Sequence, residues 1–98
     1  MMRLFWTPEA IQDRDDIFDF IEADNSAAAL ALDELFEEKV GRLIDHPELG
    51  RPGRIAGTRE LVAHQNYVVG YDVIGPQVRV LRILHAARQW PPGRKTDD

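Results

Sequence analysis

The sequence predicts an α+β fold, in which an N-terminal strand is followed by an antiparallel helical hairpin that packs on one face of a twisted, mostly antiparallel four-stranded sheet. Residues 8–44 repeat apolar side chains every three or four positions, as amphipathic helices do. Residues 58–85 instead alternate apolar and polar side chains, as half-buried strands do. The length of 98 residues suits one small core, so residues 1–98 are expected to form a single domain.

The composition is typical of a globular protein, because 44% of the residues are hydrophobic and 30% are charged. The sequence has no run of about 18 apolar residues to span a bilayer, and no export leader at its start. A cytoplasmic location without a membrane partner is therefore expected. The chain contains no cysteine, which excludes disulfides, thiolate catalysis and the usual structural zinc sites.

The first half is predicted to form a strand and two helices. Residues 3–6 are β-prone, and the Thr-Pro-Glu triplet that follows combines a helix cap, a first-turn proline and an acid. This helix is expected to end near Asp24 or Asn25, and Ser26 is expected to cap the next helix. The connection is so short that the two helices must run antiparallel. The apolar positions of the second helix are Leu32, Leu35, Phe36, Val40, Leu43 and Ile44.

Three strands are predicted in the second half, at about residues 58–63, 67–74 and 78–85, with turns at 64–66 and 75–77. Since the helices bury the apolar face of the sheet, its other face should be left open to solvent. The polar tail of residues 91–98, rich in proline and glycine, is expected to fray.

Charge is divided unequally along the chain, whose net charge is −5. Residues 1–50 contain four basic and thirteen acidic side chains, whereas residues 51–98 contain eight basic and four acidic ones. Such an asymmetry indicates an interaction surface. We expect the sheet to gather the basic groups and the histidines of the second half in one solvent-facing recess, with the acidic hairpin behind it.

His64 and His85 are the candidate catalytic residues, because each ends or follows a predicted strand and the two can meet if the last strands form a hairpin. A neutral and a protonated imidazole can act as general base and general acid near neutral pH. That chemistry cleaves RNA through its own 2′-hydroxyl group. The alternative is that each histidine bonds to nearby backbone and has a structural role.

Four arginines are candidates for handling a phosphate. Arg59 and Arg88 are expected to lie nearest to the histidines and to stabilise charge on the scissile phosphate. Arg51 and Arg54, in the loop that precedes the sheet, would bind the substrate. The alternative for all four is a solvated surface that offsets the acidic helices.

Three aromatic residues, Tyr67, Tyr71 and Trp90, are candidates for stacking on RNA bases. Tyr67 and Tyr71 share a strand face, so core packing is the alternative role of both, and Trp90 can instead anchor the C-terminus. The acidic runs fit exposed helix faces and form no pattern of metal ligands. Neither a metal nor another cofactor is expected.

Several segments together resemble the toxins of the RelE/ParE superfamily from bacterial type II toxin-antitoxin modules, in particular its RelE/StbE-like branch. They are LFWTPEA, HPELGRPGR, GTRELVAHQNYVVGYDV and VRVLRILHAARQWP, and together with the helical hairpin they cover most of the chain. The resemblance implies the same α+β fold. It also implies a cognate antitoxin whose extended C-terminal segment wraps the toxin.

The resemblance implies one of two activities. RelE-type relatives are metal-independent endoribonucleases that cut ribosome-bound mRNA, and His64 and His85 fall where some of them keep functional histidines. ParE-type relatives instead poison DNA gyrase by binding it, and they need no nuclease residues. A third possibility is a degenerate member that binds only its antitoxin.

The chain departs from the RelE-type pattern at one important position. Many RelE-type nucleases have an arginine just before the apolar part of the middle strand, where this chain reads Gln-Asn-Tyr at residues 65–67. Its only lysines are Lys39 and Lys95, so the lysine-rich catalytic surface of the best-known branch is absent. We expect an mRNA endonuclease, with a gyrase poison as the alternative.

Overall fold

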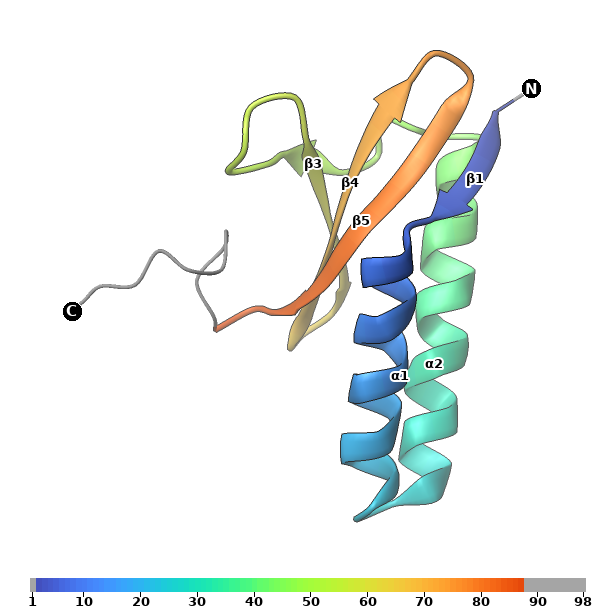
Figure 1. Ribbon diagram of the computed structural model, residues 1–98, viewed down its shortest axis with the longest axis vertical. Helices are drawn as coiled ribbons and strands as arrows, with labels where there is room; N and C mark the ends of the chain where they lie inside the picture. Colours follow the sequence, from blue (N-terminus) through green and yellow to red (C-terminus); the bar gives the residue numbers. More distant parts are fainter. Residues whose placement is uncertain (1, 88–98) are drawn as a thin grey trace, which may run out of the picture.

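The computed structural model describes residues 2–87, and its elements follow the predicted order (Figure 1). The α+β prediction is confirmed, and the three long strands begin and end within one residue of their predicted positions. The predicted fraying of residues 91–98 lies outside the described part of the chain. The elements are β1 (Arg3–Trp6), α1 (Pro8–Glu22), α2 (Ser26–Gly41), the 3-10 helix η1 (Arg42–Ile44), β2 (Arg51–Pro52), β3 (Arg59–His64), β4 (Tyr67–Ile74) and β5 (Gln77–His85).

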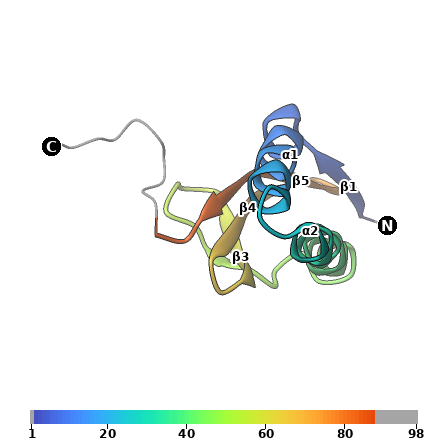
Figure 2. The ribbon, with the colours of Figure 1, turned by 90° about the horizontal axis from the view of Figure 1, so that it is seen from below.

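The sheet has five strands rather than the four predicted, in the order β1-β5-β4-β3-β2. The additional strand, β2, has only two residues, which is too short for an alternating pattern to reveal. β1 pairs in parallel with β5, and the other neighbouring strands are antiparallel. A view along the helices places β1 and β3 at opposite sides of the sheet (Figure 2). Because β1 pairs with β5, the first and last described strands of the chain lie side by side.

The two helices begin at side-chain caps. Thr7 accepts a hydrogen bond from the backbone N–H of Ala10 at 3.1 Å, as predicted. α2 is capped by Asn25, whose side-chain oxygen accepts from the N–H of Ala28 at 3.0 Å. The prediction that Ser26 is the cap is wrong by one residue, because α1 ends earlier than predicted and Ser26 already belongs to α2.

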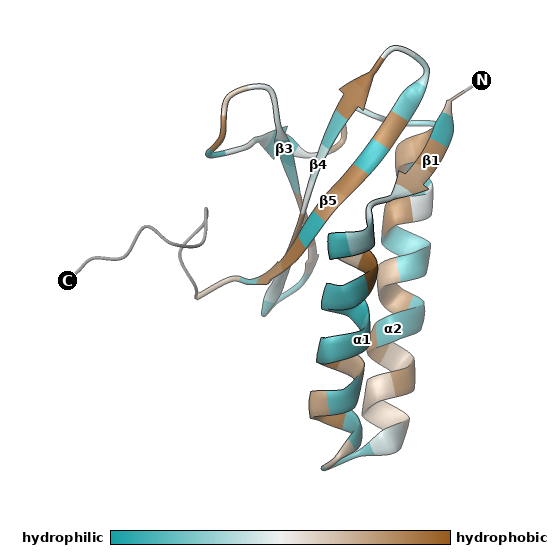
Figure 3. Cartoon of the chain, in the orientation of Figure 1, coloured by the Kyte–Doolittle hydropathy of each residue, from teal (hydrophilic) through white to brown (hydrophobic). Residues whose placement is uncertain are grey.

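Both helices pack on one face of the sheet and share one core with it. Hydrophilic residues follow much of α1, whereas hydrophobic residues are prominent in β4 and β5 (Figure 3). Tyr71 is fully buried in this core, and Tyr67 packs against its margin with its ring edge-on to Phe36. The buried core residues are Ala10, Leu32, Phe36, Val40, Leu43, Leu61, Ala63, Val69, Tyr71, Val78, Val80 and Ile83.

Arg14 joins the two helices of the hairpin. Its guanidinium contacts Asp33 at 2.8 Å and Glu37 at 3.0 Å, both on α2. It also lies over the ring of Trp6, 4.7 Å from the ring centre. In residues 2–87, no helix combines the length and the apolar character needed to cross a membrane.

Candidate functional site

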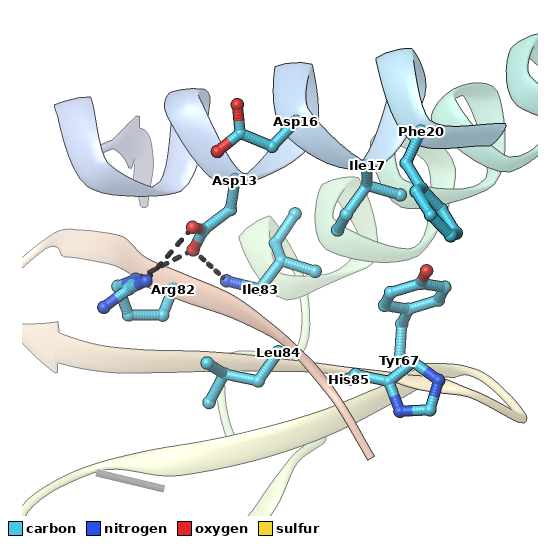
Figure 4. A pocket seen from close by; sticks show the side chains of 9 residues that line it. All are labelled: Asp13, Asp16, Ile17, Phe20, Tyr67, Arg82, Ile83, Leu84 and His85. Carbon is cyan, nitrogen blue, oxygen red and sulfur yellow. Dashed lines mark hydrogen bonds and ion pairs between the residues drawn. The ribbon is translucent and has the colours of Figure 1, made fainter. Parts of the chain in front are cut away.

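A recess opens between α1 and the second half of β5, next to the start of β4 (Figure 4). β1 pairs with β5 only as far as Val80, and α1 follows β1 directly. The helix therefore covers the part of β5 that has no strand beside it. The recess has a volume of about 540 Å³ and is lined by Asp13, Asp16, Ile17, Phe20, Tyr67, Arg82, Ile83, Leu84 and His85.

The structure brings both candidate histidines to the same end of the sheet. His64 ends β3 and His85 ends β5, and each is the pairing partner of Tyr67 at the start of β4. The ring centre of Tyr67 lies 6.0 Å from that of His64 and 5.3 Å from that of His85. The three rings therefore form a row across three strands, with the tyrosine in the middle.

Each histidine also bonds to nearby backbone. The N–H of Asn66 donates to Nδ1 of His64 at 3.1 Å, and the N–H of Ala87 donates to Nδ1 of His85 at 3.2 Å. A ring nitrogen that accepts a hydrogen bond carries no proton, so in both neutral rings the proton lies on Nε2. These backbone bonds fit the structural role that is the alternative for both residues.

The cation in the recess, Arg82, is paired within the chain. Its Nε and one of its terminal nitrogens contact the two oxygens of Asp13 at 2.8 and 3.1 Å (Figure 4). These hydrogen bonds raise the pKa of Arg82 above its usual value. Asp13 also accepts a hydrogen bond from the backbone N–H of Ile83 at 2.9 Å. One carboxylate of α1 thus neutralises the arginine and fixes the edge of β5.

The proposed substrate-binding arginines lie away from this recess and share one buried carboxylate. Glu60 is only 4% exposed. Arg51 approaches it at 3.5 Å and Arg54 at 3.4 Å, and the backbone N–H of Arg54 donates to it at 3.1 Å. Glu60 therefore holds the loop that contains both arginines against the start of β3.

The expectation that Arg59 lies near a histidine is wrong. Arg59 begins β3 and His64 ends it, so the two residues are separated by the length of that strand. The guanidinium of Arg59 donates to the backbone carbonyls of Gly50 at 2.6 Å and Glu48 at 3.3 Å. These bonds assign Arg59 to the anchoring of the preceding loop.

Two further candidates, Arg88 and Trp90, lie outside the described residues. Arg79, the other arginine of β5, forms a two-pronged ion pair with Asp72, with contacts of 2.9 and 2.6 Å. The expected recess of basic and imidazole groups is therefore wrong for residues 51–87, because the strand arginines of that range, Arg51, Arg59, Arg79 and Arg82, bond to carboxylates or carbonyls of the same chain. Within residues 2–87, no cluster of three or more histidine or acidic side chains could hold a metal ion.

The helical wall of the recess was not among the site residues predicted from the sequence. Asp13, Ile17 and Phe20 are four and three positions apart, which places them on one face of α1. Phe20 is 79% exposed, although phenylalanine is usually buried. The spacing is present in the sequence, but the surrounding acids are equally typical of a solvated helix face, so the pattern alone does not indicate a site.

Comparison with known proteins identifies the family. The profile of the ParE toxin of the type II toxin-antitoxin system parDE matches residues 4–90. The chain belongs to the ParE toxin family. It is 40% identical over 90 residues to Y4kP of Sinorhizobium fredii, which carries the name of a toxin, with 91% of this chain and 93% of the relative covered. It is 35% identical to toxin RelE2 of Caulobacter vibrioides over 88 residues, covering 90% and 99% of the two chains.

Solved structures of toxin-antitoxin proteins share the fold of this ParE-family chain. A chain of the chromosomal ParDE system from P. aeruginosa superimposes with a TM-score of 0.79 at 29% identity, covering 87% of this chain and 96% of that chain. A chain of the YoeB-YefM complex from Staphylococcus aureus superimposes with a TM-score of 0.58 at 12% identity, covering 87% and 97%. The second likeness concerns the fold alone.

Proposed function

We propose that this toxin arrests bacterial growth in the cytoplasm by binding a protein target, DNA gyrase, and not by cutting mRNA. The observation that carries the proposal is the chemistry of the recess beside His85. Two carboxylates, Asp13 and Asp16, lie on its helical wall, and its one described cation, Arg82, is already paired with Asp13. Because Asp13 and Arg82 neutralise each other, Asp16 leaves the recess with a net negative charge, and an RNA backbone with one negative charge per nucleotide finds no free described cation there.

The apolar part of the recess fits a protein segment better than a nucleic acid. Ile17 and Phe20 on α1 face the ring of Tyr67 across the opening (Figure 4). An exposed aromatic ring in a concave, partly apolar surface is typical of protein interaction sites. Membership of the ParE family, whose best-known activity needs no nuclease residues, supports the same assignment.

The proposal is tested by expressing the chain without an antitoxin and labelling new DNA and new protein separately. DNA synthesis should fall before protein synthesis, and the purified toxin should inhibit supercoiling by gyrase. Phe20→Ser should weaken this inhibition by at least about tenfold, because it removes a central apolar contact. Ile11→Ser is the matched control, because Ile11 is an exposed apolar residue of α1 outside the recess. Normal supercoiling at saturating toxin would overturn the proposal.

An mRNA endonuclease is the second candidate, and the row of His64, Tyr67 and His85 favours it. If the toxin is a gyrase poison, purified protein should leave mRNA on stalled ribosomes intact. Cleavage that is present in the parent chain and lost in His85→Ala would establish the nuclease instead. Gln65→Ala is the control, because Gln65 lies in the turn between β3 and β4, next to the row of rings but outside it.

We also propose that a cognate antitoxin neutralises the toxin. Solved relatives include a ParDE system and a YoeB-YefM complex, which supports a partner of this kind. Its gene should be a short reading frame next to that of the toxin. Co-expression of that reading frame should restore growth, and the two proteins should purify together.

A further inference from the structure

The recess between α1 and β5 has an acidic end and an apolar end (Figure 4). Asp13 and Asp16 line the acidic end, where Asp13 bonds to Arg82. Ile17 and Phe20 line the apolar end, which faces the start of β4. Residues three or four positions apart share one face of a helix, and on this face of α1 the acids precede the apolar residues. A partner that fills the whole recess must therefore satisfy both kinds of surface.

Asp16 is the charge of the acidic end that the chain leaves without a cation. Its side chain is exposed, and it accepts a hydrogen bond at 2.9 Å from Nε2 of Gln12, which is an uncharged amide. In the described part of the chain, no ion pair involves Asp16, whereas Asp13 and Arg82 pair with each other at 2.8 Å. A further cation can therefore bind at this end without breaking an internal ion pair.

The helix fixes the spacing between the two ends. Asp16 and Phe20 are four residues apart on α1, which corresponds to about 6 Å along the helix axis. A partner matches this spacing with a cation and an apolar side chain four positions apart on a helix or two apart on a strand, because each arrangement spans about 6–7 Å on one face. Both Asp16 and Phe20 are exposed, so one segment can contact both.

We propose that the recess binds a segment of the target protein in which a lysine or arginine lies about one helical turn from a large apolar side chain. The cation contacts the carboxylate of Asp16, and the apolar side chain packs between Phe20 and Tyr67. The identity of the target rests on the proposed function, and the inference adds the chemistry by which the target is recognised. A segment with a carboxylate in place of the cation is excluded, because Asp16 repels it.

The charge contribution is tested by measuring the affinity of the purified toxin for gyrase. Asp16→Lys should raise the dissociation constant at least about tenfold, and added salt should weaken its binding less than that of the parent. Asp15→Lys is the matched control, because Asp15 is exposed on α1 outside the recess and the variant has the same net charge. Equal effects of the two substitutions would overturn the inference. If Phe20→Ser weakens binding and Asp16→Lys does not, the proposed function stands and this inference fails.

A second test does not depend on gyrase. Two alanine-based helical peptides serve as probes, one with a leucine and a lysine four positions apart and the other with glutamate in place of the lysine. The lysine peptide should shift the amide NMR signals of residues 13–20 and 82–85, and the glutamate peptide should bind at least about tenfold more weakly. Equal binding of the two peptides, or no shift with either at millimolar concentration, would overturn the inference. If the toxin does not inhibit gyrase, the proposed function fails, but the peptide affinities still test the recess.

Discussion

At the scale of single residues, Tyr71 is the side chain on which the position of the loop before the sheet depends. It is fully buried, and its hydroxyl donates to the carbonyl of Pro47 at 2.7 Å and accepts from the N–H of Gly50 at 2.8 Å. Burial raises the pKa of Tyr71, because the charged phenolate is poorly solvated there. A β-carbon at Gly50 would lie 2.7 Å from the ring of Tyr71, so the loop also requires glycine at this position.

Tyr71→Phe is expected to lower the free energy of unfolding by about 1–3 kcal/mol, because it leaves a buried N–H without its acceptor. The raised pKa of Tyr71 also makes its contribution to stability depend on pH. That contribution is complete below the unfolded-state pKa of about 10 and is lost as the pH rises through the folded-state pKa. Urea unfolding between neutral and alkaline pH measures both effects. The variant should lose less stability than the parent above pH 10, and parallel curves would contradict this.

At the scale of elements, α1 completes the edge of β5 that β1 leaves unpaired. Thr7 donates from its hydroxyl to the carbonyl of Leu81 at 3.1 Å, and Asp13 accepts from the N–H of Ile83 at 2.9 Å. Side chains of the helix thus bond to backbone groups that another strand would otherwise bind. The same contact pairs Asp13 with Arg82, which removes the arginine from the recess.

Asp13→Ala is expected to lower the free energy of unfolding by about 2–3 kcal/mol, because it leaves both the partly buried Arg82 and an edge N–H without a partner. Asp13→Asn should lose less, since an amide oxygen still accepts from Ile83. Asp16→Ala is the control, because Asp16 is exposed and bonds only to Gln12 among the described contacts. Equal losses for Asp13→Ala and Asp16→Ala in urea unfolding would contradict this view of the edge.

At the scale of the whole molecule, the chain divides into a packed centre and a protruding hairpin end. β4 and β5 lie inside the sheet and contribute Val69, Tyr71, Val78 and Val80 to the core. The far end of the hairpin extends beyond the sheet (Figure 1), and residues 22–28 are exposed. Local stability should therefore decrease from the sheet centre toward the hairpin turn.

Native-state hydrogen exchange measures this gradient directly. Amides of residues 68–72 should exchange slowest, through global unfolding, because they belong to an interior strand with buried side chains. Amides near the turn at residues 23–26 should exchange at least about a hundredfold faster, by local fraying. Equal protection of the two segments would indicate that the hairpin end is covered in solution, for example by a second copy.

Local sequence patterns are sufficient to predict the α+β class, the order of elements and most of the core, because helical and strand periodicities are local and strong. The Thr7 cap and the apolar stripe of α2 are readable within a few residues. The sequence was also sufficient to predict that His64 and His85 lie at the same end of the sheet. The reason is that a hairpin places the end of β5 beside the start of β4.

Which charged side chains are free of an internal partner depends on contacts that form only in the folded chain. Arg82 pairs with Asp13, which is 69 residues earlier, and Arg59 bonds to carbonyls of a loop whose path has no periodic signal. The group to which each of these arginines bonds depends on how α1 packs along β5 and on where β2 joins β3. Neither arrangement can be predicted from local residue spacing. A sequence shows how many cations a chain has, whereas a fold determines which of them its own carboxylates already neutralise.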